Sequence, residues 1–188
     1  SCTVTLQIAR IPMPPTSVTE DVDEALHAVE NYGEAVFKPL YTSKARGMCL
    51  IEAGPGARHR IAEYQAENPI MYIQKKIDLH GRDLGVAFLG GEYMTTYARC
   101  NQGGSWNTTT VNGGKYRPHE PSKDTIEIAR KAQALFDLDF TCVDVVEMED
   151  GPVVFEVSAF GGFRGILEAS GIDAARKYVD YVLERLKS

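Results

Sequence analysis

The sequence has no long hydrophobic run and no closely spaced cysteines. No stretch approaches the roughly eighteen apolar residues that a membrane-spanning helix needs. Cys2, Cys49, Cys100 and Cys142 lie far apart with no C-x-x-C pair, so neither a zinc site nor a disulfide framework is predicted. Because Cys49 and Cys142 fall in apolar runs, we expect buried thiols, a reducing cytoplasmic compartment and no membrane partner.

Positive charge is scarce as well. The 188 residues include 20 Lys and Arg against 26 Asp and Glu, which gives a formal net charge of -6. This balance argues against nucleic acid as the main partner, although a local group of cations could still receive an anionic ligand. The chain is 44% hydrophobic and 24% charged, as is usual for a globular protein, and its length fits one domain with room for two lobes.

Several familiar chemical signatures are also missing. No G-x-G-x-x-G or G-x-x-x-x-G-K-[ST] loop occurs, the four histidines lack metal-ligand spacing, and no Ser-His-Asp or Cys-His arrangement is evident. The periodicity predicts an α+β fold of two small sheets, each carrying helices, rather than a doubly wound sheet. The expected elements are a helix from Thr19 or Asp21 to Gly33, strands over 34–40 and 47–53, a helix with Ile61 and Tyr64 inward, a strand over 70–77, a hairpin over 83–100, a loop over 101–121, a helix begun by Asp124, a hairpin over 143–162 and a helix from Asp173.

Local signals refine two of these helices. Asp124 and Glu127 have the spacing of a capping box, which places a helix N-terminus there. The last helix carries Ala175, Val179, Val182 and Leu186 at helical spacing.

Two acids interrupt the apolar hairpin over residues 143–162. Asp144 and Glu156 stand where core residues are expected, on strands joined by a tight turn. Paired on one face, the two carboxylates would repel each other unless one is protonated or a divalent cation lies between them. Their oxygens suit Mg²⁺ or Mn²⁺, and Ser158 offers a third oxygen on the same face. The alternative is a solvated pair of acids, or acids paired with Lys and Arg.

A lysine ends another apolar strand. Lys38 is costly to bury there unless it meets an anion. The polar loop that follows, YTSKARG, adds Lys44 and Arg46 among small residues that can fold over phosphates. Taken alone, such a lysine is more often simply exposed. Together with a carboxylate pair that can hold Mg²⁺, it favours a nucleoside triphosphate as the ligand.

In their order, these features resemble the ATP-grasp fold, and within it the RimK-like group of ATP-dependent carboxylate–amine ligases. The resemblance covers nearly all the 188 residues. It implies two α+β lobes that grip ATP between their sheets, a central lobe over residues 1–76 and a C-terminal lobe over residues 77–188. It also implies a preceding substrate-binding domain that this chain lacks, so we expect the chain to be the core of a longer protein.

The resemblance assigns roles to individual motifs. VFK carries the phosphate-binding lysine, YIQKKI at residues 72–77 is the hinge that receives adenine, GRD ends in the ribose-binding acid, and WNTTTVNGG completes the nucleotide site. Arg99 stands near the phosphates, and we add Arg164, in GGFRG, as a candidate for holding the substrate carboxylate. The implied sets are nucleotide-binding Lys38, Lys44, Arg46, Gln74, Lys75, Lys76, Asp83, Asn107, Thr108 and Thr109, metal-binding Asp144, Glu156 and Ser158, and catalytic Lys38, Arg99 and Arg164.

The chain departs from the family pattern at four places. Lys75 replaces an acid at the hinge, Ser158 replaces a metal-binding Asn, residues 107–109 replace Arg-Ser-Asn, and Gly85 stands where an Arg is common. The last two changes remove positive charge near the phosphates and the acceptor. They bear on catalytic strength and substrate identity more than on nucleotide binding.

The resemblance implies a two-step reaction. A small-molecule or peptide carboxylate takes the γ-phosphoryl group of ATP to give an acyl phosphate, and the amine of an amino acid then displaces phosphate. Two alternatives stay open, an ATP-binding module without ligase activity and a small-molecule kinase on the same fold. The sequence also leaves homo-oligomerisation open.

Overall fold

The computed structural model describes residues 2–40, 46–101 and 115–187, and the chain forms two compact units. The smaller unit is Pro14–Asp78, and the larger combines Ser1–Met13 with Leu79–Ser188. The expected division into residues 1–76 and 77–188 differs from these units chiefly at the N-terminus. Helix α1 (Cys2–Ile8) belongs to the larger unit because Leu6 and, just beyond the helix, Ile11 are buried in its core.

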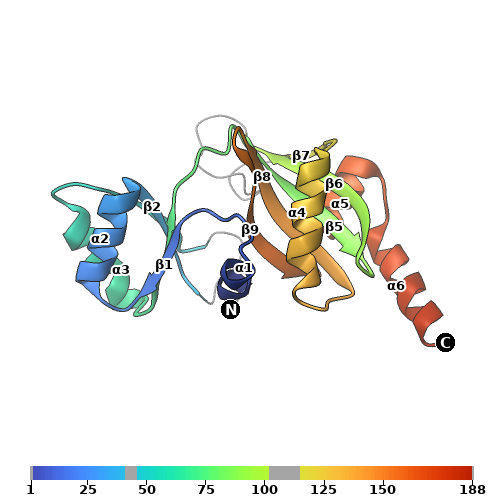
Figure 1. Ribbon diagram of the computed structural model, residues 1–188, viewed down its shortest axis with the longest axis horizontal. Coiled ribbons are helices and arrows are strands. Elements are labelled where there is room, and N and C mark those ends of the chain that lie inside the picture. Colours follow the sequence, from blue (N-terminus) through green and yellow to red (C-terminus); the bar gives the residue numbers. More distant parts are fainter. Residues whose placement is uncertain (1, 41–45, 102–114, 188) are drawn as a thin grey trace. The chain divides into compact units, whose positions relative to one another are not determined.

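The smaller unit is a four-stranded antiparallel sheet with two helices. Its sheet has the order β1-β4-β2-β3, and the core between sheet and helices includes Phe37, Ile61, Tyr64 and Ile73. Figure 1 shows α2 and α3 side by side in this unit. Its elements are β1 (Thr16–Thr19), α2 (Val22–Tyr32), β2 (Glu34–Lys38), β3 (Cys49–Glu52), α3 (Ala57–Glu67) and β4 (Met71–Lys75).

Sequence signals set the limits of α2 as predicted. The Asp21 side chain accepts hydrogen bonds from the backbone N–H groups of Asp23 and Glu24, 2.8 and 2.9 Å long, and so caps the N-terminus. Gly33, at φ 77°, ends the helix in a conformation that glycine adopts without strain. By contrast, Cys49 is only half-buried, because β3 is an edge strand of the sheet.

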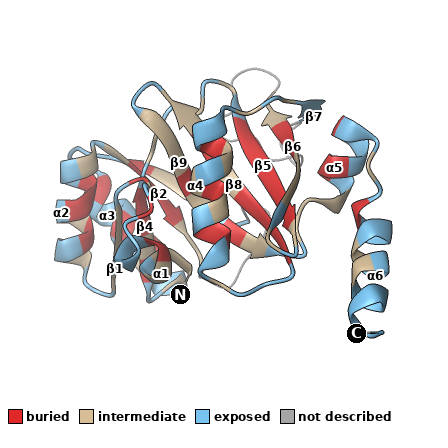
Figure 2. Ribbon diagram, turned by 45° about the vertical axis from the view of Figure 1, so that its right-hand side comes forward, coloured by how far each residue is buried: buried red, intermediate tan, exposed pale blue. Residues whose placement is uncertain are grey.

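The larger unit is a five-stranded antiparallel sheet with helices on both faces. The strand order is β7-β6-β5-β8-β9. On β5, Leu84, Val86 and Phe88 pack with α1 and α4, whereas Ala87 packs with α5 on the opposite face. In Figure 2, buried residues follow β5, β8 and the side of α4 that meets them. The remaining elements are β5 (Arg82–Leu89), β6 (Glu92–Cys100), β7 (Lys115–Pro118), α4 (Lys123–Ala134), β8 (Phe140–Met148), β9 (Gly151–Ala159), α5 (Phe163–Ser170) and α6 (Ala174–Arg185).

Among the residues that the structure describes, four elements escaped the sequence analysis. They are α1, the short strand β1, the strand β7 inside the expected loop over 101–121, and α5, whose glycine-rich start resembles a turn. Three apolar residues at helical spacing along and just after α6 are not covered, since Val179, Val182 and Leu186 are 53%, 36% and 78% exposed. Helical spacing alone therefore did not tell which side of α6 is covered. Across the described ranges, no helix is long and apolar enough to cross a membrane.

The N-terminus of α4 also differs from the predicted capping box. The hydroxyl of Ser122, rather than Asp124, accepts the backbone N–H of Thr125 at 3.1 Å. The backbone N–H of Ser122 donates in turn to Glu147 on β8 at 3.0 Å, and the hydroxyl of Thr125 donates to the same carboxylate at 2.8 Å. The cap therefore joins the helix to the sheet, which a purely local motif does not do.

We predict that Ser122→Ala lowers the free energy of unfolding by about 1 kcal/mol, the usual cost of losing an N-cap. Asp124→Ala, in the same helical turn, serves as the matched control and should cost less, because its side chain does not cap the helix. Urea unfolding of both variants measures the difference. An equal or larger loss of unfolding free energy in Asp124→Ala would support the predicted capping box and contradict the cap by Ser122.

Candidate functional site

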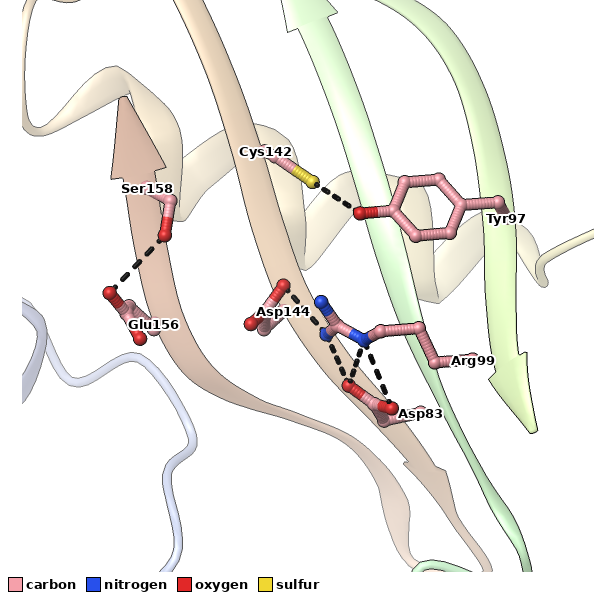
Figure 3. A network of polar contacts seen from close by, with 7 residues as sticks. All are labelled: Asp83, Tyr97, Arg99, Cys142, Asp144, Glu156 and Ser158. Atoms are coloured by element: carbon pink, nitrogen blue, oxygen red, sulfur yellow. Dashed lines mark hydrogen bonds and ion pairs between the residues drawn. The ribbon is translucent and has the colours of Figure 1, made fainter. Parts of the chain in front are cut away.

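One face of the larger sheet gathers charged side chains from four adjacent strands. Asp83 on β5 pairs with Arg99 on β6, and Asp144 on β8 pairs with Glu156 on β9. Since β5 also pairs Gly85 with Asp144, the four charged residues share one face. Figure 3 shows this arrangement, which confirms the predicted pairing of Asp144 with Glu156.

Irregular strand geometry accompanies the pair of acids. Between Asp144 and Val145 the register of β8 against β9 shifts, because Glu156 faces Asp144 whereas Val154 faces Val145. An extra residue of this kind, here Phe155, is a β-bulge, and bulges re-aim neighbouring side chains. The bulge lies directly beside Glu156.

Arg99 lies at the centre of the charged group. Its Nε donates to the two carboxylate oxygens of Asp83 at 2.9 and 3.2 Å, and its Nη2 also contacts that carboxylate. The same Nη2 lies 2.9 Å from Oδ1 of Asp144. The side chains of Asp83, Arg99 and Asp144 are only 12%, 18% and 24% exposed. Partial burial strengthens these attractions, and removing one partner would leave a costly charge.

The charges in this group do not balance. Two carboxylates share one guanidinium, and Glu156 adds a third carboxylate beside Asp144. Burial raises the pKa of Asp144 to about 6; Arg99 lowers it, while Asp83 and Glu156 raise it further. Burial disfavours the charged form of Arg99, but Asp144 and Asp83 outweigh that effect and raise the pKa of the guanidinium. The face therefore carries excess negative charge.

The oxygen donors fit a hard divalent cation. Asp144 and Glu156 supply carboxylates, and the Ser158 hydroxyl donates to Oε1 of Glu156 at 3.2 Å, so it lies at the same place. Within the described residues, no group of three or more His, Cys, Asp and Glu side chains could hold a metal by itself. Mg²⁺ usually takes one or two carboxylates and completes its shell with water and phosphate oxygens.

A second group of polar side chains lies in the smaller unit, around Lys38. The ammonium of Lys38 donates to Oε1 of Gln74 at 2.6 Å, and Nε2 of Gln74 donates to the Thr16 hydroxyl at 3.0 Å. That hydroxyl donates to the carbonyl of Pro14 at 2.8 Å. Gln74 is 1% exposed, so this relay of hydrogen bonds fixes the orientation of the amide and of the ammonium that it contacts.

The other hinge residues point elsewhere. Lys75 is exposed at the end of β4, whereas the Lys76 ammonium pairs with Glu34 at 3.0 Å. Arg46 is exposed. Lys44, Asn107, Thr108 and Thr109 lie outside the described residues.

Arg164 does not join the charged group on the sheet. It lies on α5, is 76% exposed, and its Nε donates to Glu168 one helical turn later at 2.6 Å. Such exposed pairs contribute little to stability. A role for Arg164 toward a substrate therefore stays a prediction.

Two features escaped the sequence analysis. The contact of Gln74 with Lys38 joins residues 36 positions apart, and only the pairing of β2 with β4 brings them together. Tyr97 lies beside Arg99, with its hydroxyl 3.5 Å from Sγ of Cys142. Strand periodicity offered one signal for Tyr97, since residues 97 and 99 of one strand face the same side.

The raised pKa of Asp144 gives a pH-dependent prediction. Between about pH 4 and pH 6 the folded chain keeps a proton on Asp144 that the unfolded chain has lost, so stability falls as pH rises through this window. Asp144→Asn removes that penalty. The variant should gain stability relative to the parent from pH 4.5 to pH 7.5, by at most about 3 kcal/mol.

Urea unfolding at the two pH values, without divalent cations, measures this gain. Asp150→Asn, at an exposed turn of the same hairpin, is the control for the amide substitution. A loss of stability in Asp144→Asn that is larger at pH 7.5 than at pH 4.5 would mean that the Arg99 contact dominates.

Comparisons with known proteins place the chain in a family. Residues 1–182 match the model of the RimK-like ATP-grasp domain. Tetrahydromethanopterin:alpha-L-glutamate ligase of Methanocaldococcus jannaschii is 27% identical over 191 residues, covering 98% of this chain and 65% of that protein. Ribosomal protein bS6--L-glutamate ligase of Escherichia coli O139:H28 is 27% identical over 175 residues, covering 92% and 58%. The chain thus spans less than two thirds of either relative.

Solved structures share the fold at lower identity. The ATP-grasp ligase PsnB, complexed with a minimal precursor, has a TM-score of 0.77 at 20% identity and covers 97% of this chain and 58% of PsnB. D-cycloserine synthetase DcsG also has a TM-score of 0.77 at 20% identity, with 97% and 68% covered. Because the family model extends over nearly the whole chain and these folds agree with it, the chain belongs to the RimK-like ATP-grasp domain family.

Proposed function

We propose that this chain is the nucleotide-binding core of an ATP- and Mg²⁺-dependent carboxylate–amine ligase. The main observation behind this proposal is that Asp144 and Glu156 lie opposite each other beside Arg99 and form an acid-rich face. The named relatives in this family are ligases. The rest of the proposed enzyme, including a substrate-binding domain, belongs to a longer protein that works in the cytoplasm.

In this proposal the acid-rich face holds the metal. Asp144 and Glu156 would be the ligands, with the Ser158 hydroxyl as a further oxygen. Bound there, Mg²⁺ would neutralise the charge of the phosphate oxygens during transfer. Arg99 already contacts Asp144 and would share its remaining donors with the phosphates. Asp83 would keep Arg99 oriented through their close contacts, and its ribose contact, expected from the sequence, stays a prediction.

The reaction needs no side-chain nucleophile. An oxygen of the substrate carboxylate attacks the γ-phosphorus, the bond to the bridging oxygen of ADP breaks, and an acyl phosphate forms. The nitrogen of an amine then attacks the acyl carbon, loses a proton, and phosphate leaves. Positioning and charge neutralisation are the protein's contribution to such transfers. Lys38, in the smaller unit, would bind a phosphate group through its ammonium.

The acceptors are proposed by class. Two named relatives are glutamate ligases, and the PsnB structure holds a precursor. These names support a small-molecule or peptide carboxylate and the amine of an amino acid. Arg164 is a candidate for binding the acceptor carboxylate, because it is exposed near the start of α5, directly after the strand that bears Glu156.

The first test is calorimetric binding of a non-hydrolysable ATP analogue. We expect binding that requires Mg²⁺ and weakens at least about tenfold, or 1.4 kcal/mol, in Asp144→Ala and in Glu156→Ala, because each loses a metal ligand. Glu127→Ala, an exposed acid on α4, is the control and should bind like the parent chain. An affinity that is the same without Mg²⁺ and in both Asp144→Ala and Glu156→Ala would contradict the assignment of these residues as metal ligands.

Product analysis with the full-length protein then separates the candidate activities. Amide plus phosphate identifies a ligase, ADP with a phosphorylated acceptor identifies a kinase, and nucleotide binding without turnover identifies a binding module. The last two outcomes would each overturn the ligase proposal.

A separate prediction concerns Gln74. Gln74→Glu keeps the size of the side chain but places a carboxylate where the Lys38 ammonium now meets an amide oxygen at 2.6 Å. The new charge would neutralise Lys38, so affinity for the ATP analogue should fall about tenfold, with a smaller loss for AMP. Gln7→Glu, which adds the same charge at an exposed position of α1, is the control. Equal losses for both nucleotides would show that Gln74 acts on adenine instead.

A further inference from the structure

We propose that Tyr97 is a positioning residue that holds Arg99 and the glycine turn after β9, and that Gly85 is glycine in order to admit its ring. This inference rests on the proposed function, since Arg99 and β9 belong to the proposed ligase site. It concerns how that site is supported and adds no new ligand.

Tyr97 lies beside the charged group. It is 2% exposed, on β6, and faces the same side of the sheet as Arg99, whose guanidinium carbon lies 5.9 Å from the centre of the ring. Figure 3 shows its hydroxyl directed at Cys142 on β8. The ring therefore lies across β5, from the strand of Arg99 to the strand of Asp144.

Gly85 shows that the ring fills a space that a side chain would otherwise take. A Cβ at residue 85 would lie 2.6 Å from both Cε1 and Oη of Tyr97, and closer still to Cζ. Real carbon contacts are never this short. Gly85 is an ordinary strand residue without a positive φ, and glycine in a strand interior weakens the strand. Room for the ring is thus the reason for glycine at this position.

The same ring also determines where α5 begins. A Cβ on Gly162 would lie 2.8 Å from the Tyr97 hydroxyl, and a Cβ on Gly165 would lie 2.6 Å from Cε2. The first turn of α5 therefore packs so closely against the Tyr97 ring that no Cβ atom fits between them. A Cβ on Gly161 would lie 3.2 Å from Cβ of Ser158, so this turn also covers the end of the strand that carries the metal-binding candidates.

The ring keeps these neighbours apart without adding charge. Burial raises the pKa of the Tyr97 hydroxyl, and the neighbouring Cys142 raises it further, so the phenol stays neutral beside Arg99. Cys142 is itself buried. Tyr97 thus acts as a neutral spacer, with the Asp83–Arg99–Asp144 group on one side and α5 on the other. A smaller side chain would let α5 and Arg99 shift toward the vacant space.

The test compares Tyr97→Phe, Tyr97→Leu, Gly85→Ala and the double variant Gly85→Ala/Tyr97→Leu in Mg²⁺-dependent binding of the ATP analogue. Tyr97→Phe keeps the ring and should bind within about twofold of the parent. Tyr97→Leu and Gly85→Ala should each lose about tenfold. The double variant should be no weaker than Tyr97→Leu alone, because the added methyl then has room.

Tyr93→Leu is the matched control. Tyr93 is a half-buried aromatic residue of the same strand, and it packs into the core on the opposite face. Its substitution should therefore lower the stability of the chain without changing the affinity for the ATP analogue. All affinities are compared at a temperature where urea unfolding shows each variant to be folded. Parent-like binding by folded Tyr97→Leu, a harmless Gly85→Ala, or additive losses in the double variant would each overturn the proposal.

A second readout separates this proposal from the proposed function. The NMR signal of the Arg99 Nε–H, identified by its loss in Arg99→Lys, should exchange with solvent at least tenfold faster in Tyr97→Leu and Gly85→Ala but not in Tyr93→Leu. If the parent chain binds no nucleotide while this pattern holds, the ligase proposal fails and the positioning role stands. Unchanged exchange in both Tyr97→Leu and Gly85→Ala overturns the positioning role, whatever binds.

Discussion

The site depends on one arginine that two carboxylates share. Arg99 contacts both Asp83 and Asp144, and all three side chains are largely withdrawn from water. Because these side chains are shielded from water, each charge needs its partners to be stable. The ion contacts therefore favour the observed register of β5 with β6 and β8. Glu156 then leaves the group with more negative than positive charge. That excess negative charge destabilises the folded chain without a bound cation, and it would attract a cation to the site.

The larger sheet separates this costly group from its stabilising core. Its opposite face packs on α1 and α4 with apolar residues, and on the site face α5 contributes to an apolar cluster that includes Phe140 and Ile166. Tyr97 and Cys142 belong to that cluster and border the charged residues. The sheet thus changes from a packed core to an ionic surface along single strands, within two residues in the case of β6. Because the boundary is so short, the size and shape of the side chain that forms it, Tyr97, should matter.

The predictable parts of the molecule are those set by local rules. Asp21 and Gly33 delimit α2, and the tight turn of the second hairpin fixes the register that pairs Val145 with Val154. The bulge at Phe155, which local rules did not predict, then brings Asp144 opposite Glu156. The contacts that sequence reasoning missed are non-local. Arg99 meets an acid 45 positions away, and Ser122 is the N-cap of α4 in a network that includes Glu147 on another strand. No spacing rule reports such pairs before the sheet order is known.

Each of the two units, taken by itself, carries a charged group of opposite sign. The larger unit holds a surplus of carboxylates that a divalent cation would relieve. The smaller unit holds Lys38 in place through a neutral amide, a contact that orients the ammonium without cancelling its charge. A carboxylate at residue 74 would bind the ammonium more strongly and leave less of it for an anion. A divalent cation would balance the acids of the larger unit, and a phosphate group would balance the lysine of the smaller unit. A neutral ligand would balance neither. The charge that each unit carries by itself is the physical reason to test Mg²⁺ and nucleotide binding before a neutral metabolite.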